Sequence, residues 1–489
     1  MNKKILLFLI FLCFISMVSV SAVDDLPVNN TSGSFTDLEN LIKDAESGST
    51  INLDSDYAYD EGFSINGITI NKNITINGNG HTLDGKNAAR ILNIDGGYVV
   101  LNNTVFRNGY ASNSIGAIRC SGAQLTITKC TFIDNHANGT SAGNNRFAQG
   151  IVAGAVYIYS DNCIISDNRF INNTVSGSGG AVAIDGKNNL IEGNTFTNNR
   201  ALHNMNGGAL LIGQGAGNII RGNTFENNFA GMGGGAVELQ KSSGDIIENN
   251  RFINNKADYG GAVSIYNTGY FTLKNNYFEG NLANGITLGN NLGIGGALRV
   301  YIADSSKTSV ISGNTIKSNV ADTTGGAFYI VGDNIKITGN KFTSNKASAK
   351  AAGAVRTVGN NIDISDNEFT TNSAGRSGGA LYLEGNNIKV TSNNFKNNRA
   401  PSGCDVAFAN SDNGRVTGNT FDVYKKTSIA TDYCHNMLIR NNKRVLEKTK
   451  IKASGKTYFV ASKSKLLSVT LKNSKGKTIS SKKLTLKIR

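Results

Sequence analysis

The sequence is short of the residues that most often build catalytic and metal sites. Its 489 residues include no tryptophan, two prolines and four histidines. Histidine is the usual acid–base group near neutral pH and the commonest metal ligand, so clustered histidines would be the first sign of such a site. The four histidines are scattered: His81, His136, His203 and His435. The sequence therefore predicts no metal site, no cofactor and no histidine-based catalysis.

Cysteine is also scarce, with six residues in the whole chain. Cys13 lies in the N-terminal apolar run. The others are far apart in the sequence: Cys120, Cys130, Cys163, Cys404 and Cys434. An odd, widely spread set is not typical of a disulfide framework, and no CxxC pair suggests zinc. These cysteines are expected to be small apolar residues, with one disulfide bond remaining an option.

Only one long apolar run occurs, and it lies at the N-terminus. Lys3 and Lys4 precede the run from Ile5 to Val20, and Val20-Ser21-Ala22 has the form of a signal-peptidase site. No later segment approaches the roughly 18 apolar residues of a membrane helix. Residues 1–22 are therefore expected to be a signal peptide, the alternative being an uncleaved anchor. The chain is predicted to be secreted or on the cell surface, without a transmembrane anchor after this segment.

The net charge of +14 belongs to the C-terminal tail. Residues 443–489 contain 15 Lys and Arg against the single acid Glu447, so the rest of the chain carries 34 basic and 34 acidic side chains. Any electrostatic partner should therefore bind the tail, and an anionic cell-wall polymer is the expected one. Export and the absence of a recognised module argue against nucleic acid.

What the chain has in abundance is a repeat. A Phe followed three residues later by Asn recurs at steps of mostly 26 to 29 residues, with Ile316 and Asn319 filling one gap. A second motif, Gly-Ala followed by an apolar residue, alternates with it, as in Gly180-Ala181-Val182. The phenylalanines are Phe132, Phe170, Phe196, Phe225, Phe252, Phe278, Phe342, Phe369 and Phe395.

Each repeat contains three short β runs separated by Gly and Asn, which is typical of one coil of a parallel β-helix. Such coils bury a continuous core only by stacking. The predicted fold is all-β, a right-handed single-stranded parallel β-helix of about thirteen coils and roughly 60 Å. The Gly residues are expected at sharp turns where a side chain would collide.

Stacked coils place equivalent residues above one another. The phenylalanines, among them Phe170, Phe196, Phe225 and Phe252, should form a buried aromatic column. Asn recurs two residues before each phenylalanine, and stacked amides can bond to the coils above and below as a ladder. Cys130 occupies this position in its coil, so the ladder should start at Asn168. Its predicted members are Asn168, Asn194, Asn223, Asn250, Asn276, Asn314, Asn340, Asn367, Asn393 and Asn419.

The ends of the chain differ from the repeats. Thr36-Asp37-Leu38-Glu39 is a candidate capping box before a short amphipathic helix with Leu38, Leu41, Ile42 and Ala45 on one face. The expected domains are a signal peptide at 1–22, an N-terminal cap at 23–62, β-helix repeats at 63–445 and a lysine-rich segment at 446–489. That last segment alternates like β-strands but is too short for a whole immunoglobulin-like sandwich.

At these motifs the chain resembles known families. The alternating Gly-Gly-Ala and Phe-x-x-Asn motifs resemble the repeats of chlamydial polymorphic outer membrane proteins. With the stretch Gly78-Asn79-Gly80-His81-Thr82-Leu83-Asp84-Gly85, the arrangement between Ser34 and Asn442 is more similar to the adhesin-like proteins of methanogenic archaea. This resemblance implies a pectate-lyase-like β-helix on a cell surface and a partial Ig-like segment at 446–489. A C-terminal membrane barrel, which an autotransporter requires, is missing from the pattern.

Many parallel β-helices cleave polysaccharides, and such an enzyme would carry paired acids on outward positions of adjacent coils. Glycoside hydrolysis needs two carboxylates about 5–10 Å apart. The Asn-Thr-Asp, Asp-Asp, Gly-His and Arg-Ile-Lys sets of polygalacturonase-like enzymes do not occur in order, and no cluster of acids with a base is evident. No catalytic residue is therefore predicted, although a polysaccharide lyase or glycoside hydrolase stays the alternative.

Binding residues are predicted on one outward row. Strand alternation turns the residue two after each Gly-Ala alanine outward, and on four consecutive coils these residues are Arg299, Tyr329, Arg356 and Tyr382. Tyr157 has the same position in an earlier coil. Aromatic faces and guanidinium groups suit an extended glycan with anionic groups, and an ordinary exposed ladder is the competing interpretation.

Two insertions, 138–150 and 284–294, are predicted to leave one corner of the coil five coils apart, where loops commonly carry recognition. The sequence thus favours an adhesin-like protein that binds an extracellular glycan or surface protein without enzymatic activity. A polysaccharide-cleaving enzyme and a purely structural envelope component are the alternatives.

Overall fold

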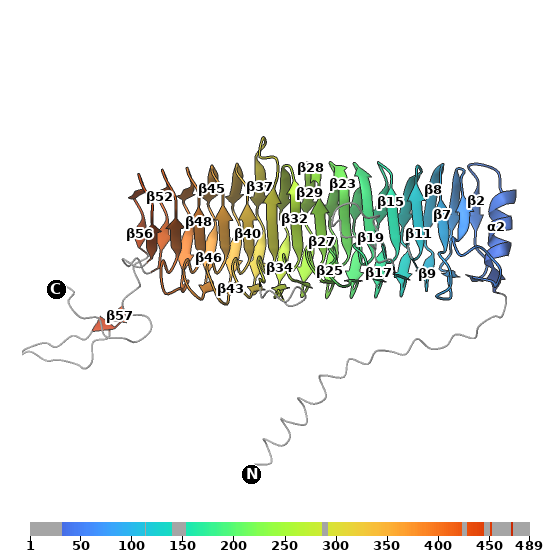
Figure 1. Cartoon of the computed structure of the whole chain (residues 1–489), viewed down its shortest axis with the longest axis horizontal. Helices are drawn as coiled ribbons and strands as arrows, with labels where there is room; N and C mark the ends of the chain where they lie inside the picture. The colour runs from blue at the N-terminus through green and yellow to red at the C-terminus, as the bar shows by residue number, and fades with distance from the viewer. Residues whose placement is uncertain are drawn as a thin grey trace, which may run out of the picture.

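The computed structural model describes residues 32–112, 114–138, 153–285, 292–422, 428–444, 450–451 and 471–472. The chain forms a rod of stacked coils, with the coils following one another along the axis in sequence order (Figure 1). A representative coil contains β15 (Val156–Tyr159), β16 (Ile164–Ser166), β17 (Arg169–Ile171) and β18 (Thr174–Val175). Equivalent strands of successive coils pair in parallel, so the chain is a parallel β-helix.

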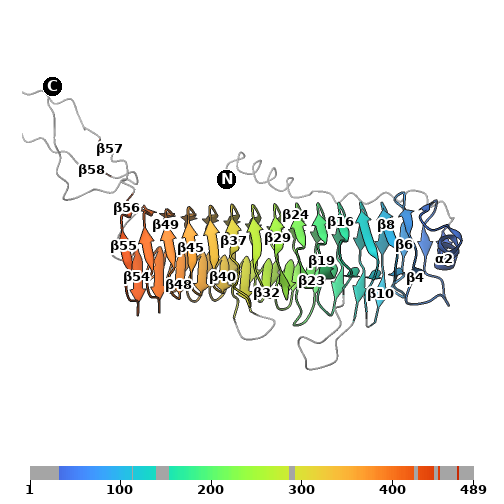
Figure 2. The ribbon, with the colours of Figure 1, turned by 90° about the horizontal axis from the view of Figure 1, so that it is seen from above.

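These pairings make four sheets, named A to D here. Sheet A has 16 strands, from β1 (Gly33–Ser34) to β56 (Lys443–Arg444), and sheet B has 15, from β2 (Thr50–Asn52) to β55 (Leu438–Arg440). Sheet D has 10, from β10 (Tyr110–Ala111) to β47 (Ser373–Ala374). Within a coil the chain passes through sheets C, B, A and D in turn, and Figure 2 shows the rod after a quarter turn.

Sheet C carries the predicted binding row. Its main path consists of the following strands: β4 (Ile68–Ile70), β7 (Leu92–Ile94), β11 (Ile118–Ser121), β15, β19 (Val182–Lys187), β23 (Leu210–Ala216), β27 (Val237–Gln240), β32 (Val263–Thr268), β36 (Leu298–Ile302), β40 (Phe328–Val331), β44 (Val355–Val358), β48 (Leu381–Glu384), β51 (Val406–Ala409) and β54 (Ile429–Asp432). The short strand β28 (Ser242–Ser243) pairs with β23 beside this path.

The rod has about 15 turns, slightly more than the thirteen predicted. Coils that lack the Phe-x-x-Asn motif occur at both ends of the rod: β54, β55 and β56 form one after Phe421, and others form at the N-terminal end. Leu83 and Phe106 stack in the column there, and Gly109 stands three residues after Phe106. The parallel sheets also include β2 and β3 (Tyr57–Ala58), which lie within the segment assigned to the cap.

The core is a column of fully buried rings in sheet A. From Phe106 to Phe278 successive rings stack face to face with centroids 4.7 to 5.0 Å apart. Ile316 interrupts the column, and Phe328, reaching in from sheet C, packs edge-on against Phe278 at 6.2 Å and Phe342 at 5.1 Å. The missing ring is therefore replaced from another strand, and the core stays filled.

An asparagine ladder follows the turn between sheets B and A. Asn168 is typical: its backbone N and its Nδ2 both donate to Oδ1 of Asn194, at 2.9 and 3.0 Å, and Nδ2 also donates to the carbonyl of Ile127. Cys130 donates its backbone N–H to Asn168 Oδ1. The residue before the ladder has a positive φ, as at Asp167 (56°), a conformation that Asn, Asp and Gly adopt most readily.

A second ladder, at the turn between sheets A and D, uses the asparagine of the Phe-x-x-Asn motif. Asn173 donates from N and Nδ2 to Asn199 Oδ1, and Nδ2 also bonds the carbonyl of Phe132. The sequence shows this asparagine in every repeat motif but predicts no role for it. Its members are Asn135, Asn173, Asn199, Asn228, Asn255, Asn281, Asn319, Asn345, Asn372 and Asn398.

A single described helix, α2 (Phe35–Asp44), covers the N-terminal end of the rod (Figure 1). Its capping box pairs Ser34 with Asp37, two residues before the predicted start at Thr36, whose hydroxyl instead donates to Asp60. Phe35, Leu38 and Ile42 are buried, whereas Leu41, predicted on the apolar face, is 46% exposed. Because the helix begins at Phe35, this residue belongs to its first turn. Its side chain lies inward, where the ring packs against Tyr59 and Phe63.

Within the described residues, no helix combines the length and apolar character needed to cross a lipid bilayer. Of the predicted tail segment, the structure describes one antiparallel pair, β57 (Lys450–Ile451) with β58 (Leu471–Lys472). The remainder of residues 446–489 lies outside the described residues.

Candidate functional site

The register of sheet C brings four of the predicted binding residues together. Arg299 on β36 pairs with Tyr329 on β40, which pairs with Arg356 on β44, which pairs with Tyr382 on β48. Neighbouring strands lie about 4.8 Å apart, so the four side chains follow one another along the rod. All four are partly exposed.

Arg356 is the centre of this group. Its guanidinium lies 5.5 Å from the ring centroid of Tyr329 and 5.3 Å from that of Tyr382, and its Nη2 donates to Glu384 Oε1 at 2.7 Å. Burial raises the pKa of Tyr329 to about 12, with a contribution from the hydrogen bond to Tyr301. The pKa of Tyr382 is also raised, first by burial and then by Glu384. Both tyrosines are therefore neutral ring faces at physiological pH.

Arg299 has different aromatic partners. Its guanidinium lies 4.7 to 4.9 Å from the ring centroids of Tyr259, Tyr266 and Tyr301. Tyr266 and Tyr301 belong to a second outward row, two residues further along the strands. Three rings around one cation constitute a strong cation–π environment, so Arg299 is held more firmly than a solvated arginine.

The outward row is not exposed along its whole length, contrary to the prediction. Ala183, Leu211, Glu238 and Ser264 are buried although their register positions match Arg299. Ala183 and Leu211 form a small apolar cluster with Ile115 and Ala153. The face therefore has two exposed stretches, one on either side of a covered centre.

Glu238 occupies the covered centre. Burial raises its pKa to about 7, while the charge of Arg299 and the polar groups of Ser264 and Gln240 oppose the shift. Gln240 Nε2 donates to its Oε1 at 3.3 Å, and its buried Oε2 has no hydrogen-bond partner in the described part of the chain. A Cβ placed on Gly233 would lie 3.0 Å from Oε2, so the segment joining sheets D and C closes over this carboxylate.

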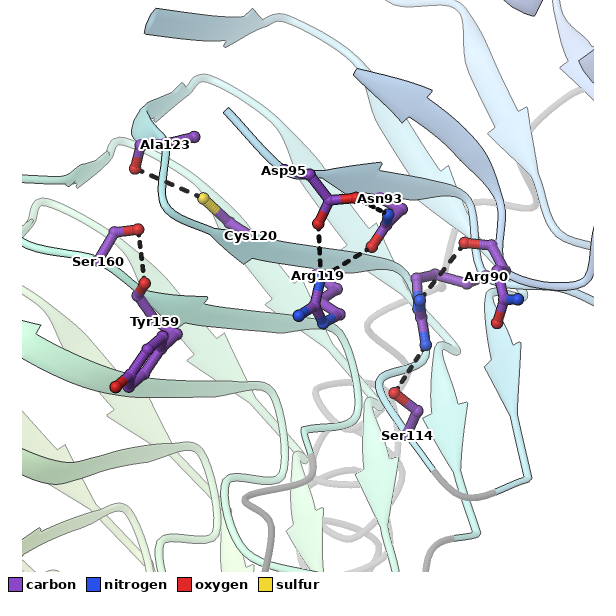
Figure 3. A network of polar contacts seen from close by, with 10 residues as sticks. Arg90, Asn93, Asp95, Ser114, Arg119, Cys120, Ala123, Tyr159 and Ser160 are labelled. Atoms are coloured by element: carbon purple, nitrogen blue, oxygen red, sulfur yellow. Dashed lines mark hydrogen bonds and ion pairs between the residues drawn. The ribbon is translucent and has the colours of Figure 1, made fainter. Parts of the chain in front are cut away.

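Tyr157 lies apart from the other predicted residues, five strands from Arg299 in the order of sheet C. Its hydroxyl donates to Asp185 Oδ2 at 3.2 Å, and burial raises the pKa of both groups. In the coil before it, Arg119 donates to Asp95 at 2.7 Å and to Asn93 at 3.2 Å (Figure 3). Tyr157 therefore belongs to a separate N-terminal stretch of the face.

A groove that the sequence did not reveal lies beside this N-terminal stretch, at the corner between sheets C and B. Its volume is about 710 Å³, and Tyr159, 59% exposed, is one of its walls. The sequence signal was the longer spacing of 29 residues between Phe196 and Phe225, a span that contains β23, which has one more residue than β19 at their register shift.

The groups suited to acid–base or metal chemistry are dispersed. His81 lies 3.3 Å from Asp56 beside sheet A at the N-terminal end of the rod, and His435 lies 2.9 Å from Asp412 at the corner between sheets C and B at the C-terminal end. No cluster of three or more His, Cys, Asp or Glu able to hold a metal occurs among the described residues. The predicted insertions 138–150 and 284–294 fall largely outside those residues, although the strands flanking both belong to sheets D and C.

The chain matches the right handed beta helix region family over residues 153–361 and 298–465, together more than half of its length. The chain belongs to the right-handed β-helix family. No curated protein matches it.

Among solved structures, this right-handed β-helix is similar to a mannuronic acid specific polysaccharide family 6 lyase from human gut microbiota. The identity is 15%, with 74% of this chain and 86% of the lyase covered and a TM-score of 0.47. The alginate lyase AlyF-OU02 is 17% identical, with coverages of 86% and 89% and a TM-score of 0.46. A tailspike protein of E. coli bacteriophage HK620, bound to a hexasaccharide, is 14% identical, with coverages of 82% and 75% and a TM-score of 0.44. Similarity at this level concerns the fold.

Proposed function

We propose that this right-handed β-helix is an exported, adhesin-like protein that binds an acidic glycan at the cluster of Tyr329, Arg356 and Tyr382. The observation that carries the proposal is the guanidinium of Arg356 placed between two neutral tyrosine rings. Rings bind the apolar faces of sugars, and a guanidinium binds carboxylates with directed hydrogen bonds. The combination suits a chain of uronic acids running along the rod.

The immediate surroundings of Arg356 support this assignment. One amino group, Nη2, is bonded to Glu384, and both side chains remain about one-fifth exposed, at 21% and 23%. A partly exposed pair of this kind contributes little to stability, because solvent screens it. Arg356 can therefore exchange part of its contact with Glu384 for a ligand carboxylate.

Surface attachment is the second part of the proposal. The lysine-rich segment 446–489 has the charge to hold the rod against an anionic cell-wall polymer. The β-helix would then present sheet C to a glycan or protein of another cell.

Retention on immobilised polygalacturonate, at low and at physiological salt, tests the glycan site. Arg356→Ala and Tyr382→Ala are expected to reduce retention at least tenfold. Arg251→Ala is the matched control, because Arg251 makes a similar contact with Tyr277, at 5.0 Å, on sheet A. Equal retention of the Arg356 and Arg251 variants would overturn the assignment.

A polysaccharide-cleaving enzyme is the second candidate, and Glu238 is the observation in its favour. Its pKa of about 7 suits a general acid or base, and it lies two strands from Arg299 on the same row. Its burial argues against direct contact with a sugar. Mass spectrometry of the polysaccharide after incubation decides between the two: unchanged chain lengths support binding, and shortened or unsaturated products support catalysis.

A further inference from the structure

The corner groove beside Tyr159 has a construction of its own. In most coils the sheet C strand ends within four or five residues, as β15 does, but β19 and β23 continue for six and seven. A β-bulge between Ile184 and Gly186 shifts the register there, and Gly186 then pairs with Gly215. The extended strands form one side of a groove that spans four successive coils, from the turn at Gln124 to Gly215.

The floor of the groove is bare backbone. A Cβ on Gly186 would collide with the carbonyl of Ser160, and a Cβ on Gly215 would collide with the carbonyl of Gly186. The backbones of three coils therefore approach so closely that only glycine fits at these two positions. The groove thus follows from the packing of these coils.

The walls offer directed polar groups. Asp161 Oδ1 accepts the backbone N–H of Lys187 at 2.7 Å, and Asp185 Oδ1 accepts that of Gln214 at 2.7 Å. These bonds orient each carboxylate, and the Tyr157 hydroxyl donates to the other oxygen of Asp185. The second oxygen of Asp161 and the side-chain ends of Lys187 and Gln214 make no hydrogen bond to other residues in the described ranges. They line the groove as spare acceptors and donors.

An aromatic platform completes the site. Tyr159 is 59% exposed although tyrosines on the same sheet further along the rod are half-buried. Its strand lies next to that of Cys120; the Ser160 hydroxyl donates to the carbonyl of Tyr159, and the Cys120 thiol donates to that of Ala123 in the neighbouring coil (Figure 3). An exposed ring beside fixed hydrogen-bonding groups suits the apolar face and hydroxyl groups of a pyranose.

The charge of the groove selects between glycans. Its lining includes two carboxylates, Asp161 and Asp185, against one ammonium group, Lys187. A polyuronate would meet like charge here, whereas a neutral sugar would meet only hydrogen-bonding groups. The cluster of Tyr329, Arg356 and Tyr382, by contrast, favours an acidic glycan over a neutral one.

We propose that the groove is a second glycan site, which binds a neutral oligosaccharide laid along the rod axis with one sugar ring on Tyr159. This site does not depend on the acidic-glycan site. It makes the rod a two-site binder, with a neutral segment held near the N-terminal end and an acidic one held about 30–40 Å away, at seven to eight strand spacings.

The test is a calorimetric titration of the whole exported chain with cellohexaose, mannohexaose and maltohexaose. Binding of at least one hexasaccharide is expected, with a loss of at least tenfold in Tyr159→Ala and no change in Arg356→Ala. Tyr433→Ala, which removes a tyrosine that is 87% exposed at the other end of the rod, is the matched control. Thermal unfolding of each variant checks that the fold is intact.

Two results would overturn the inference. One is that none of the three hexasaccharides binds, and the other is that Tyr159→Ala binds them as the unaltered chain does. Polygalacturonate binding by Arg356→Ala tests the acidic-glycan site, and hexasaccharide binding by Tyr159→Ala tests the groove. The two proposals can therefore fail independently of each other.

Discussion

Arg356 and Glu384 form an ion pair across neighbouring strands of sheet C, with Nη2 and Oε1 2.7 Å apart. Glu384 therefore occupies part of the guanidinium that an acidic ligand would use. Glu384→Gln removes this competitor and is expected to tighten polygalacturonate binding about two- to fivefold, the range of a partly exposed ion pair. Calorimetry at constant ionic strength measures the change.

Glu368→Gln, on the exposed face of sheet A, is the control for the loss of one negative charge. An equal gain in both variants would show a general charge effect. Weaker binding in Glu384→Gln would mean that Glu384 orients Arg356 for the ligand and does not compete with it.

The asparagine ladder should carry much of the stability of the rod. Asn223 accepts from the N and Nδ2 of Asn194 and donates to Asn250 and to the carbonyl of Ile191, all inside the protein. Asn223→Ala leaves these buried groups unpaired and is expected to cost about 3 kcal/mol. Asn52→Ala, an exposed amide that accepts a single bond from Asn77, should cost less than about 0.5 kcal/mol. Denaturant unfolding followed by circular dichroism compares them, and equal losses would contradict the ladder's role.

Ile316, which interrupts the phenylalanine column, and Phe328, which packs beside it, can be tested with a compensating pair of substitutions. Phe328 already fills the space beside Ile316, so Ile316→Phe alone should overpack the core and destabilise it by about 1–3 kcal/mol. Adding Phe328→Val to that variant should recover most of the loss, because the new ring completes the column. Thermal unfolding of the two single variants and the double variant measures this coupling. Additive losses would mean that the two side chains do not share one space.

Two buried acids should make the stability depend on pH. Burial raises the pKa of Glu238 and of Asp405 to about 7, so both bind protons more strongly in the folded chain than in the unfolded chain. Compared with neutral pH, the two acids therefore add to the free energy of unfolding at pH values below about 4, where both states are protonated. This contribution is lost as the pH rises towards 7, because the unfolded chain then releases its protons before the folded chain does. Glu238→Gln with Asp405→Asn should flatten the profile between roughly pH 4.5 and 7. An unchanged slope in this double variant would contradict the argument.

The repeats could be predicted from the sequence because they reflect strong local and stacking rules. A motif that returns at nearly constant spacing must stack, so the parallel coils, the buried rings and the register from Arg299 to Tyr382 all follow from counting residues. Coils without the motif, around Leu83 and Phe106, could not be counted in this way, and the prediction of thirteen coils was slightly low.

The parts that could not be predicted depend on contacts between distant segments. Glu238 has an outward position in its strand, but the segment containing Gly233 covers it, and strand alternation carries no information about that cover. The corner groove lies beside a register shift, where β23 has one more residue between Ile212 and Gly215 than β19 has between Ile184 and Gly186. The second asparagine ladder was visible as a motif, but its role required the position of the next coil.

Arg356 is proposed to bind an acidic glycan on sheet C. Calorimetric titration of the chain, its Arg356→Ala variant and its Arg251→Ala variant with a hexamer of galacturonic acid measures this binding. We expect saturable binding that weakens at least tenfold in Arg356→Ala and stays unchanged in Arg251→Ala. Binding that is absent from the unaltered chain, or that is the same in both variants, would contradict it.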